Sequence, residues 1–184
     1  MATRPILLIS GTNRPDSNAL RVARVILGHY QAIGANVEIF SLEELPREVF
    51  DPSSYATKPP GMVAIQQRVL DASGLHIVTP EYNGSFPGVL KYFIDMLKFP
   101  ESFENKPVAF TGEAAGIWGA LRPIEHLQAI FGYRNAHIFP DRVFIPGIPQ
   151  KLDAQGKMLD AAIDKRLAKQ AAGFVAYVAK FAVN

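Results

Sequence analysis

The chain of 184 residues contains no cysteine. Disulfide bonds, thiolate metal sites and a cysteine nucleophile are therefore excluded, and the composition fits the reducing cytoplasm, where we expect the protein to reside. Long apolar runs are also missing, since no stretch approaches the roughly 18 residues that a membrane-spanning helix needs. The apolar segment at residues 6–9 is too short for a secretory signal, because a glycine and polar residues follow it directly.

An excess of one charge is missing as well. The sequence has 19 Lys and Arg residues against 17 Asp and Glu residues, and the basic residues are dispersed along the chain. We therefore expect no nucleic-acid partner and no membrane partner. The 4 histidines form no local cluster and no pair at i, i+4 spacing, so the sequence predicts no metal site.

Three common chemical motifs are absent. No glycine pattern ends in Lys-Ser or Lys-Thr, which excludes the phosphate loop of mononucleotide kinases and GTPases. Gly11 stands alone after the first apolar segment, so the G-x-G-x-x-G fingerprint of a dinucleotide site is missing too. No serine lies in a nucleophile-elbow pattern, which argues against a serine hydrolase.

Alternating strand-like and helix-like segments fill the chain. With 48% apolar residues it is long enough for one compact domain spanning residues 1–184. Strands are predicted at residues 6–9, 36–40, 75–78, 107–110 and 135–139, with 142–145 extending or flanking the last one, and helices at 18–33, 62–72, 89–97, 120–131 and 159–181. This alternation predicts a three-layer α/β domain with a parallel sheet and helices on both faces. Residues 41–60 have little periodicity, so we expect a long surface excursion that borders a pocket.

A rigid polar loop follows the third predicted strand. Pro80 and Pro87 fix φ and remove N–H groups, so the residues between them are presented in a set shape. Glu81, Tyr82 and their neighbours are candidates to bind a ligand there. Two simpler interpretations stay open: Tyr82 fills the core, and the Asn that follows it only forms a turn.

The loop after the first predicted strand is rich in donors for an anion. Thr12, Arg14, Ser17 and Asn18 surround the expected N-terminus of a helix, whose free N–H groups attract negative charge. The simpler alternative is that Ser17 or its neighbour Asp16 only caps the helix. A third loop of small residues, 111–116, follows the fourth strand. Ligands of parallel sheets bind at this edge, outside the carboxyl ends of the strands.

Two of these loops resemble a known family. They read Gly11-Thr12-x-Arg14-x-x-Ser17-Asn18 and Pro80-Glu81-Tyr82-Asn83-x-Ser85-x-Pro87-Gly88-x-Leu90-Lys91. Both are similar to motifs of the NADPH-dependent FMN reductases of flavodoxin-like fold, a group that contains quinone, azo-dye and chromate reductases. The resemblance implies a flavodoxin-like three-layer sandwich with a five-stranded parallel sheet and helices on both faces.

The resemblance also implies which residues hold FMN. The phosphate contacts would come from Thr12, Arg14, Ser17, Asn18 and the backbone of Ala19 and Leu20; the ring contacts from Pro80, Glu81, Tyr82, Asn83, Gly84 and Ser85; and the far edge of the ring from the loop containing Thr111, Gly112 and Gly116. This chain departs from its relatives in that third loop, where it carries Glu113 and Trp118. For Trp118 we keep three interpretations: a flavin shield, a subunit contact or a core residue.

The implied activity is that of an FMN-dependent NAD(P)H oxidoreductase. Hydride would pass from NADPH or NADH through FMN to a small-molecule acceptor, such as a quinone, a flavin, an azo compound or a metal oxyanion. No catalytic side chain is assigned, because the cofactor carries the chemistry. The resemblance further implies a homodimer or homotetramer that uses the helices after the second and third loops. Two alternatives are a flavodoxin-like electron carrier without reductase activity and a protein for another phosphorylated ligand.

Overall fold

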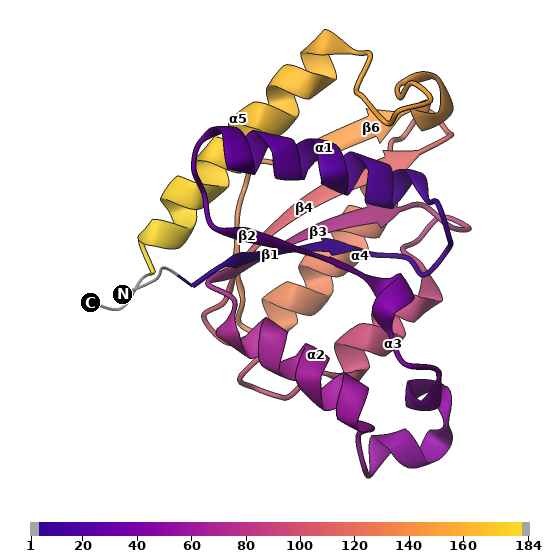
Figure 1. The fold of residues 1–184 in the computed structure, drawn as a ribbon, viewed down its shortest axis with the longest axis vertical. Helices are drawn as coiled ribbons and strands as arrows, with labels where there is room; N and C mark the ends of the chain where they lie inside the picture. Colours follow the sequence, from indigo (N-terminus) through magenta and orange to yellow (C-terminus); the bar gives the residue numbers. More distant parts are fainter. Residues whose placement is uncertain (1–3, 182–184) are drawn as a thin grey trace.

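A parallel sheet between two helical layers forms the molecule (Figure 1). The computed structural model describes residues 4–181. Its elements are, in chain order, β1 (Ile6–Ser10), α1 (Asn18–Ala32), β2 (Val37–Ser41), η1 (Leu42–Glu44), η2 (Arg47–Phe50), η3 (Pro52–Tyr55), α2 (Pro60–Asp71), β3 (Gly74–Pro80), α3 (Gly88–Met96), β4 (Pro107–Ala114), α4 (Leu121–Tyr133), β5 (His137–Ile138), β6 (Val143–Pro146), η4 (Ile148–Gln150) and α5 (Ala161–Ala179). The predicted α/β sandwich is confirmed.

The sheet has the strand order β2-β1-β3-β4-β5, and β6 also pairs with β4. All of these pairings are parallel. The strand order reverses between β1 and β3, and doubly wound sheets bind their ligands at such a switch point, outside the carboxyl ends of the strands. The strand arrows end on the right of Figure 1, where the loops after β1, β3 and β4 lie.

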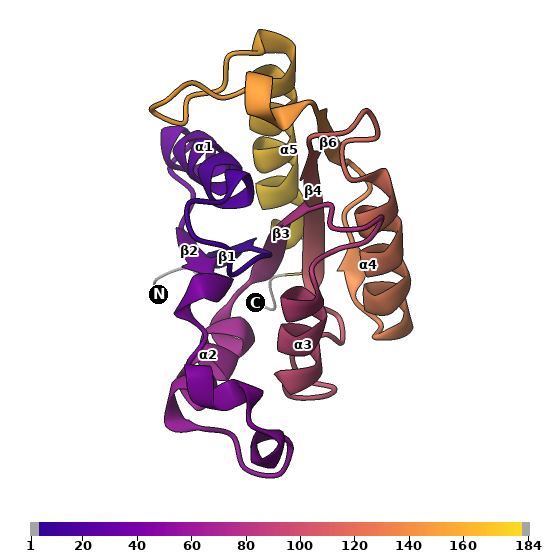
Figure 2. The same cartoon turned by 90° about the vertical axis from the view of Figure 1, so that its right-hand side faces the viewer.

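Alternation along the strands divides the core into two parts. On one face of the sheet, α1 and α5 cover Ile6, Leu8 and Val78; on the other, α2, α3 and α4 cover Leu7, Ile9 and Phe110. Figure 2 shows the two helical layers on either side of the strands. Every residue of β1, β3 and β4 is buried, as expected for central parallel strands.

Two boundaries differ from the sequence-based expectation. The fifth strand is split, because β5 pairs with Pro107–Val108 at the start of β4, whereas β6 pairs with its last four residues, Thr111–Ala114. The second difference is in β4 itself, which continues to Ala114, so the predicted loop 111–116 begins four residues too early. Strand pairing on both sides of β4 orders residues that look like a loop in the sequence.

The excursion at residues 41–60 does not border the site described below. It contains the three short helices η1, η2 and η3, and its apolar residues Leu42, Leu45 and Val49 are buried. The Tyr92 hydroxyl of α3 donates to the Val49 carbonyl oxygen at 2.6 Å. The segment therefore packs against α3, and the expectation that it lines a pocket is wrong for the cavity at the carboxyl ends of the strands.

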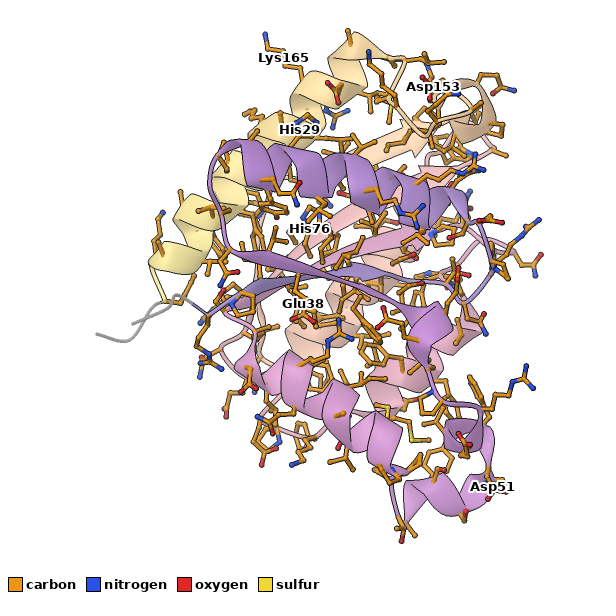
Figure 3. The ribbon with its side chains drawn as sticks, in the orientation of Figure 1. His29, Glu38, Asp51, His76, Asp153 and Lys165 are labelled. Carbon is orange, nitrogen blue, oxygen red and sulfur yellow. The ribbon has the colours of Figure 1, made fainter. Side chains whose placement is uncertain are left out.

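A chain of buried polar groups crosses the core beneath α1. The Tyr30 hydroxyl lies 2.8 Å from His76 Nδ1, and His76 Nε2 lies 2.9 Å from the Thr111 hydroxyl. That hydroxyl donates to Gln170 Oε1 at 2.7 Å, so His76 carries its proton on Nε2 and accepts from Tyr30. Burial lowers the pKa of His76 to about 3, so it stays neutral. Figure 3 shows His76 under α1, in the middle of the sheet.

Among residues 4–181, no helix is both long and apolar enough to cross a membrane. Within the same residues, no group of three or more His, Asp or Glu side chains is placed to hold a metal ion.

Candidate functional site

The loops after β1, β3 and β4 enclose one cavity of about 580 Å³. This volume lies within the roughly 300–1,000 Å³ of small-molecule sites. The lining residues are Arg14, Pro15, Asp16, Ser17, Asn18, Arg21, Pro80, Glu81, Tyr82, Glu113, Ala114, Ala115 and Ile148. Segments that are far apart in the sequence therefore meet at the predicted edge of the sheet.

The N-terminus of α1 forms one wall of the cavity. Ser17 is its N-cap, and the Ser17 hydroxyl accepts from the Leu20 N–H at 3.2 Å. The Leu20 N–H therefore already has an acceptor. Ser17 caps α1 and also lines the cavity, so its contact with a phosphate stays a prediction. The N–H groups of Asn18 and Ala19 donate to no described residue, as expected in a first helical turn. Arg14 is exposed beside them.

Thr12 joins the first loop to the second. Its side chain is fully buried, and its hydroxyl lies 3.2 Å from the Tyr82 hydroxyl and accepts from the Arg14 N–H at 3.2 Å. Thr12 is therefore a structural bridge behind the cavity wall. Gly11 lets the first loop run close to the backbone of β3, because a Cβ at Gly11 would lie 3.0 Å from the Val78 carbonyl oxygen.

The second loop is a tight turn that presents Tyr82. The N–H of Tyr82 donates to the Ser85 carbonyl oxygen at 2.8 Å, and the reverse bond is 3.1 Å. The central residues Asn83 and Gly84 have φ values of 53° and 78°, which indicates a type I′ turn. Asn83 is thus a turn former, as one interpretation expected. Tyr82 is 37% exposed, so the interpretation of Tyr82 as a core residue is wrong.

Two contacts attach this turn to α4. The Glu81 carboxylate lies 3.8 Å from the Arg122 guanidinium. The Ser85 hydroxyl lies 2.9 Å from His126 Nδ1, which places Ser85 outside the cavity lining. The shape of the second loop is therefore held from α4 as well as from Thr12.

The prediction for the loop at residues 111–116 is wrong in its residues. Thr111 is fully buried, and its hydroxyl is engaged by His76 and Gln170. Gly112 faces α4, where a Cβ would lie 2.8 Å from the Ala120 Cβ, and Gly116 lies outside the cavity lining. None of the three lines the cavity, because β4 continues through the first two. Their neighbours Glu113, Ala114 and Ala115 line it instead.

Glu113 has the most unusual environment of the cavity residues. Its side chain is only 4% exposed, and its carboxyl group has no hydrogen bond or ion pair with any described residue. Burial disfavours the charged form and raises the pKa of Glu113 to about 7. Both the neutral and the charged form of this carboxyl group are therefore accessible near neutral pH.

Sequence reasoning also missed Arg21 and Ile148 in the cavity lining. Arg21 lies three residues after Asn18 on α1, and this spacing predicts that the two side chains share one face of the helix. Ile148 begins η4 after β6, and no local pattern brings it to this edge of the sheet. Trp118 is 55% exposed, with the Arg122 guanidinium 5.7 Å from its ring centre, so its interpretation as a core residue is wrong.

A larger cavity, of about 790 Å³, lies at the opposite, amino-terminal edge of the sheet. Its two cationic groups are already engaged: Arg4 donates to carbonyl oxygens of Leu70 and Asp71, and Lys106 donates to that of Ala72 at 2.6 Å. They hold the C-terminus of α2. The smaller cavity is the better candidate, because it lies at the switch point and carries free donors.

Known proteins resemble this chain along most of its length. The sequence profile of the NADPH-dependent FMN reductases matches residues 5–150. An NAD(P)H-dependent FMN reductase, PA1204, of Pseudomonas aeruginosa is 31% identical over 84% of each chain. An NADPH:quinone oxidoreductase of Arabidopsis thaliana is 29% identical over 90% of this chain and 89% of its own. An FMN-dependent NADPH-azoreductase of Staphylococcus aureus is 32% identical over 67% of each.

A solved structure has the same fold as this chain. The flavoenzyme FerB of Paracoccus denitrificans, an NAD(P)H:acceptor oxidoreductase, superposes with a TM-score of 0.81 at 22% identity, covering 97% of this chain and 98% of its own. The relatives named above are reductases, which favours the reductase over the electron-carrier alternative. The chain therefore belongs to the NADPH-dependent FMN reductase family and is an FMN-dependent NAD(P)H oxidoreductase.

Proposed function

We propose that the cavity at the carboxyl ends of the strands holds FMN across the β1–β3 switch point. The observation that carries this proposal is the convergence of the two motif loops, whose hydroxyl groups on Thr12 and Tyr82 lie 3.2 Å apart. Both loops, together with the end of β4, line one cavity of suitable volume. The residues present therefore fit the cofactor of the family.

The α1 end of the cavity suits a phosphate group. The free N–H groups of Asn18 and Ala19 are donors at a helix N-terminus, where the dipole contributes about 0.3–1 kcal/mol toward an anion. Arg14 and Arg21 add two cationic side chains to the same wall. Their charge-assisted hydrogen bonds are about twice as strong as neutral ones. These groups support our proposal that the cofactor phosphate binds at this end of the cavity.

The other end of the cavity suits a flat ring. Pro80 and Tyr82 supply apolar and aromatic surface, and Ala114 and Ala115 add small side chains at the end of the adjacent strand β4. The N–H groups of Asn83 and Gly84 donate to no described residue, so they are available to the polar edge of a ring. Because the turn is rigid, these donors need no rearrangement to bind.

Bound FMN supplies hydride chemistry, by accepting a hydride from NADPH or NADH and reducing an acceptor. The residues of the chain bind and orient. Tyr82 is held against Thr12, and Glu81 is held toward Arg122, so the turn keeps its shape while reactants exchange. We assign no catalytic side chain and propose a quinone-type or azo-type small molecule as the acceptor, which the names of the relatives support.

We propose a homodimer, or a homotetramer built from such dimers, that uses α3 and α4. Large apolar side chains are exposed just before α4 and at its end: Ile117 at 80%, Trp118 at 55% and Tyr133 at 80%. Light scattering tests this assembly, and a monomer with full activity would contradict it. The cytoplasmic location likewise stays a prediction, for cell fractionation to test.

Anaerobic spectroscopy of the purified protein tests the function. FMN added to the protein should bind with quenched fluorescence, and its absorbance near the visible maximum should bleach on addition of NADPH or NADH. Adding a quinone should then restore the colour. Protein that binds no FMN would contradict the proposal, and FMN that binds but does not bleach would reveal an electron carrier.

A further inference from the structure

We propose that the Glu113 carboxyl group takes up one proton when FMN binds and then, as a neutral group, donates a hydrogen bond to the cofactor. The inference rests on the proposed function, because it assumes that this cavity holds FMN. It adds a proton-linked ligand group to the site.

The position of Glu113 on β4 directs its side chain toward the α1 wall. Side chains alternate along a strand, and Thr111 two residues earlier faces α5, where its hydroxyl bonds Gln170. Glu113 therefore lies on the same face of the sheet, but beyond the end of the polar chain that satisfies Thr111. It lines the cavity and is 4% exposed, and its carboxyl group has no partner among residues 4–181.

The other charged and titratable groups of the cavity lining are Arg14 and Asp16 from the first loop, Arg21 from α1, and Glu81 and Tyr82 from the second loop, whereas η4 contributes only Ile148. Arg122 of α4 lies outside the lining and pairs with Glu81. None forms an ion pair with Glu113. Burial thus decides its protonation, and it raises the pKa to about 7.

Binding of FMN shifts this balance further toward the neutral form. The phosphate brings negative charge to the α1 wall, and the ring displaces water from the cavity, so both effects disfavour a carboxylate. A carboxylate only accepts hydrogen bonds, whereas a neutral carboxyl group also donates one. The phosphate oxygens of FMN only accept hydrogen bonds, whereas its sugar-chain hydroxyls both donate and accept. The neutral form is therefore the one that complements the phosphate oxygens, and its proton comes from solvent.

Titration calorimetry measures the proton directly. FMN is titrated into the cofactor-free wild-type protein at pH 8 in two buffers of different ionisation enthalpy, which gives the number of protons taken up. Because most Glu113 carboxyl groups are ionised at pH 8 before binding, we expect an uptake of about one proton. Glu113→Gln, which is neutral at every pH, should reduce the uptake to near zero. FMN binding by wild type without proton uptake would overturn the inference and leave the proposed function intact.

The pH dependence of FMN affinity provides the second test. Between pH 7 and 9 the wild-type Kd should rise by up to about tenfold per pH unit, the limit for one proton. The phosphate titrates near pH 6, below this window. Glu113→Gln should flatten the dependence, whereas Glu43→Gln, which changes an exposed carboxylate of η1 outside the cavity, should keep the wild-type slope. Equal slopes for wild type and Glu113→Gln would refute the role of Glu113.

Discussion

Two neighbouring positions on the same face of β4 have opposite polar environments. Thr111 is fully buried, and both of its hydrogen bonds connect to a chain that runs from Tyr30 to Gln170. Glu113 is nearly as buried but has no partner in the described structure. A satisfied buried network stabilises a fold, whereas an unpaired group at a cavity wall is open to water or to a ligand. The comparison separates the structural end of the strand from the functional end.

The largest expected effect comes from a substitution in the buried hydrogen-bond network around Thr111. His76→Leu leaves the buried Tyr30 hydroxyl without its acceptor and removes a donor to Thr111. We expect a loss of about 3 kcal/mol in the free energy of unfolding at pH 7, measured by urea denaturation. Arg24→Leu, at an exposed position of α1, is the control and should change it by less than about 0.5 kcal/mol. A loss below about 1 kcal/mol for His76→Leu would show that the network is dispensable.

The next expected effect is on the pH dependence of stability and comes from Glu113, at the cavity end of β4. The folded-state pKa of Glu113 is raised from 4.5 to about 7, so its neutral form stabilises the fold below pH 4.5, and this contribution is lost as the pH rises through 7. At about 1.4 kcal/mol per pKa unit, the loss is at most about 3.5 kcal/mol. The stability of the cofactor-free Glu113→Gln variant relative to wild type should therefore increase as the pH rises from 5 to 8. Thermal melts at both pH values measure this, and an equal difference at both would contradict it.

His76 gives the opposite trend with pH, which sharpens the comparison. Its folded-state pKa is lowered from 6.5 to about 3, so the stability that its neutral form provides is present above pH 6.5 and is lost as the pH falls toward 3. The contribution of His76 should fall below pH 6, so acidification should cost His76→Leu less stability than it costs wild type. Urea denaturation from pH 7 to pH 4 checks this expectation. An unchanged acid dependence in the variant would assign the loss to other groups.

The functional end should respond to removal of its cations in binding rather than in stability. Arg14→Ala removes an exposed guanidinium from the phosphate wall, so we expect FMN affinity to fall by about 10-fold to 100-fold, measured by fluorescence quenching. Arg24→Ala, at an exposed position of α1 outside the cavity, is the matched control and should bind like wild type. Equal affinities for the two variants would move the phosphate away from Arg14.

The smallest effect is expected where the two loops touch. Tyr82→Phe keeps the ring but removes the hydroxyl that lies 3.2 Å from the Thr12 hydroxyl. A partly buried neutral hydrogen bond contributes about 0.5–1.5 kcal/mol, so FMN affinity should fall by no more than about tenfold. Tyr82→Ala also removes the aromatic surface, so its FMN affinity should be lower still. Identical affinities for the two variants would show that the ring of Tyr82 makes no contact with the cofactor.

Most of the fold could be predicted from local patterns. The apolar runs of β1 and β3 and the helical periodicity of α1 depend on neighbouring residues alone, so their positions were right to within about two residues. The end of β4 was missed because its small and polar residues have no local strand signal. Pairing with β3 and β6 orders it instead, and those strands lie far away in the sequence.

The site was predictable at its two motif loops and less so elsewhere. Arg14, Asn18 and Tyr82 line the cavity as expected, because each loop follows a strand whose carboxyl end lies at the switch point. The burial of Thr111 depends on His76 and Gln170, which are 35 and 59 residues away. No local pattern reveals such partners, and the same limit hid the cavity role of Ile148.

A crystal structure of the protein with FMN bound tests the central assignment most directly. The account predicts the phosphate at the N–H groups of Asn18 and Ala19, the ring against Tyr82, and a Glu113 carboxyl oxygen within hydrogen-bond distance of a cofactor oxygen. FMN bound in the larger cavity at the opposite edge of the sheet, beside Arg4 and Lys106, would contradict it.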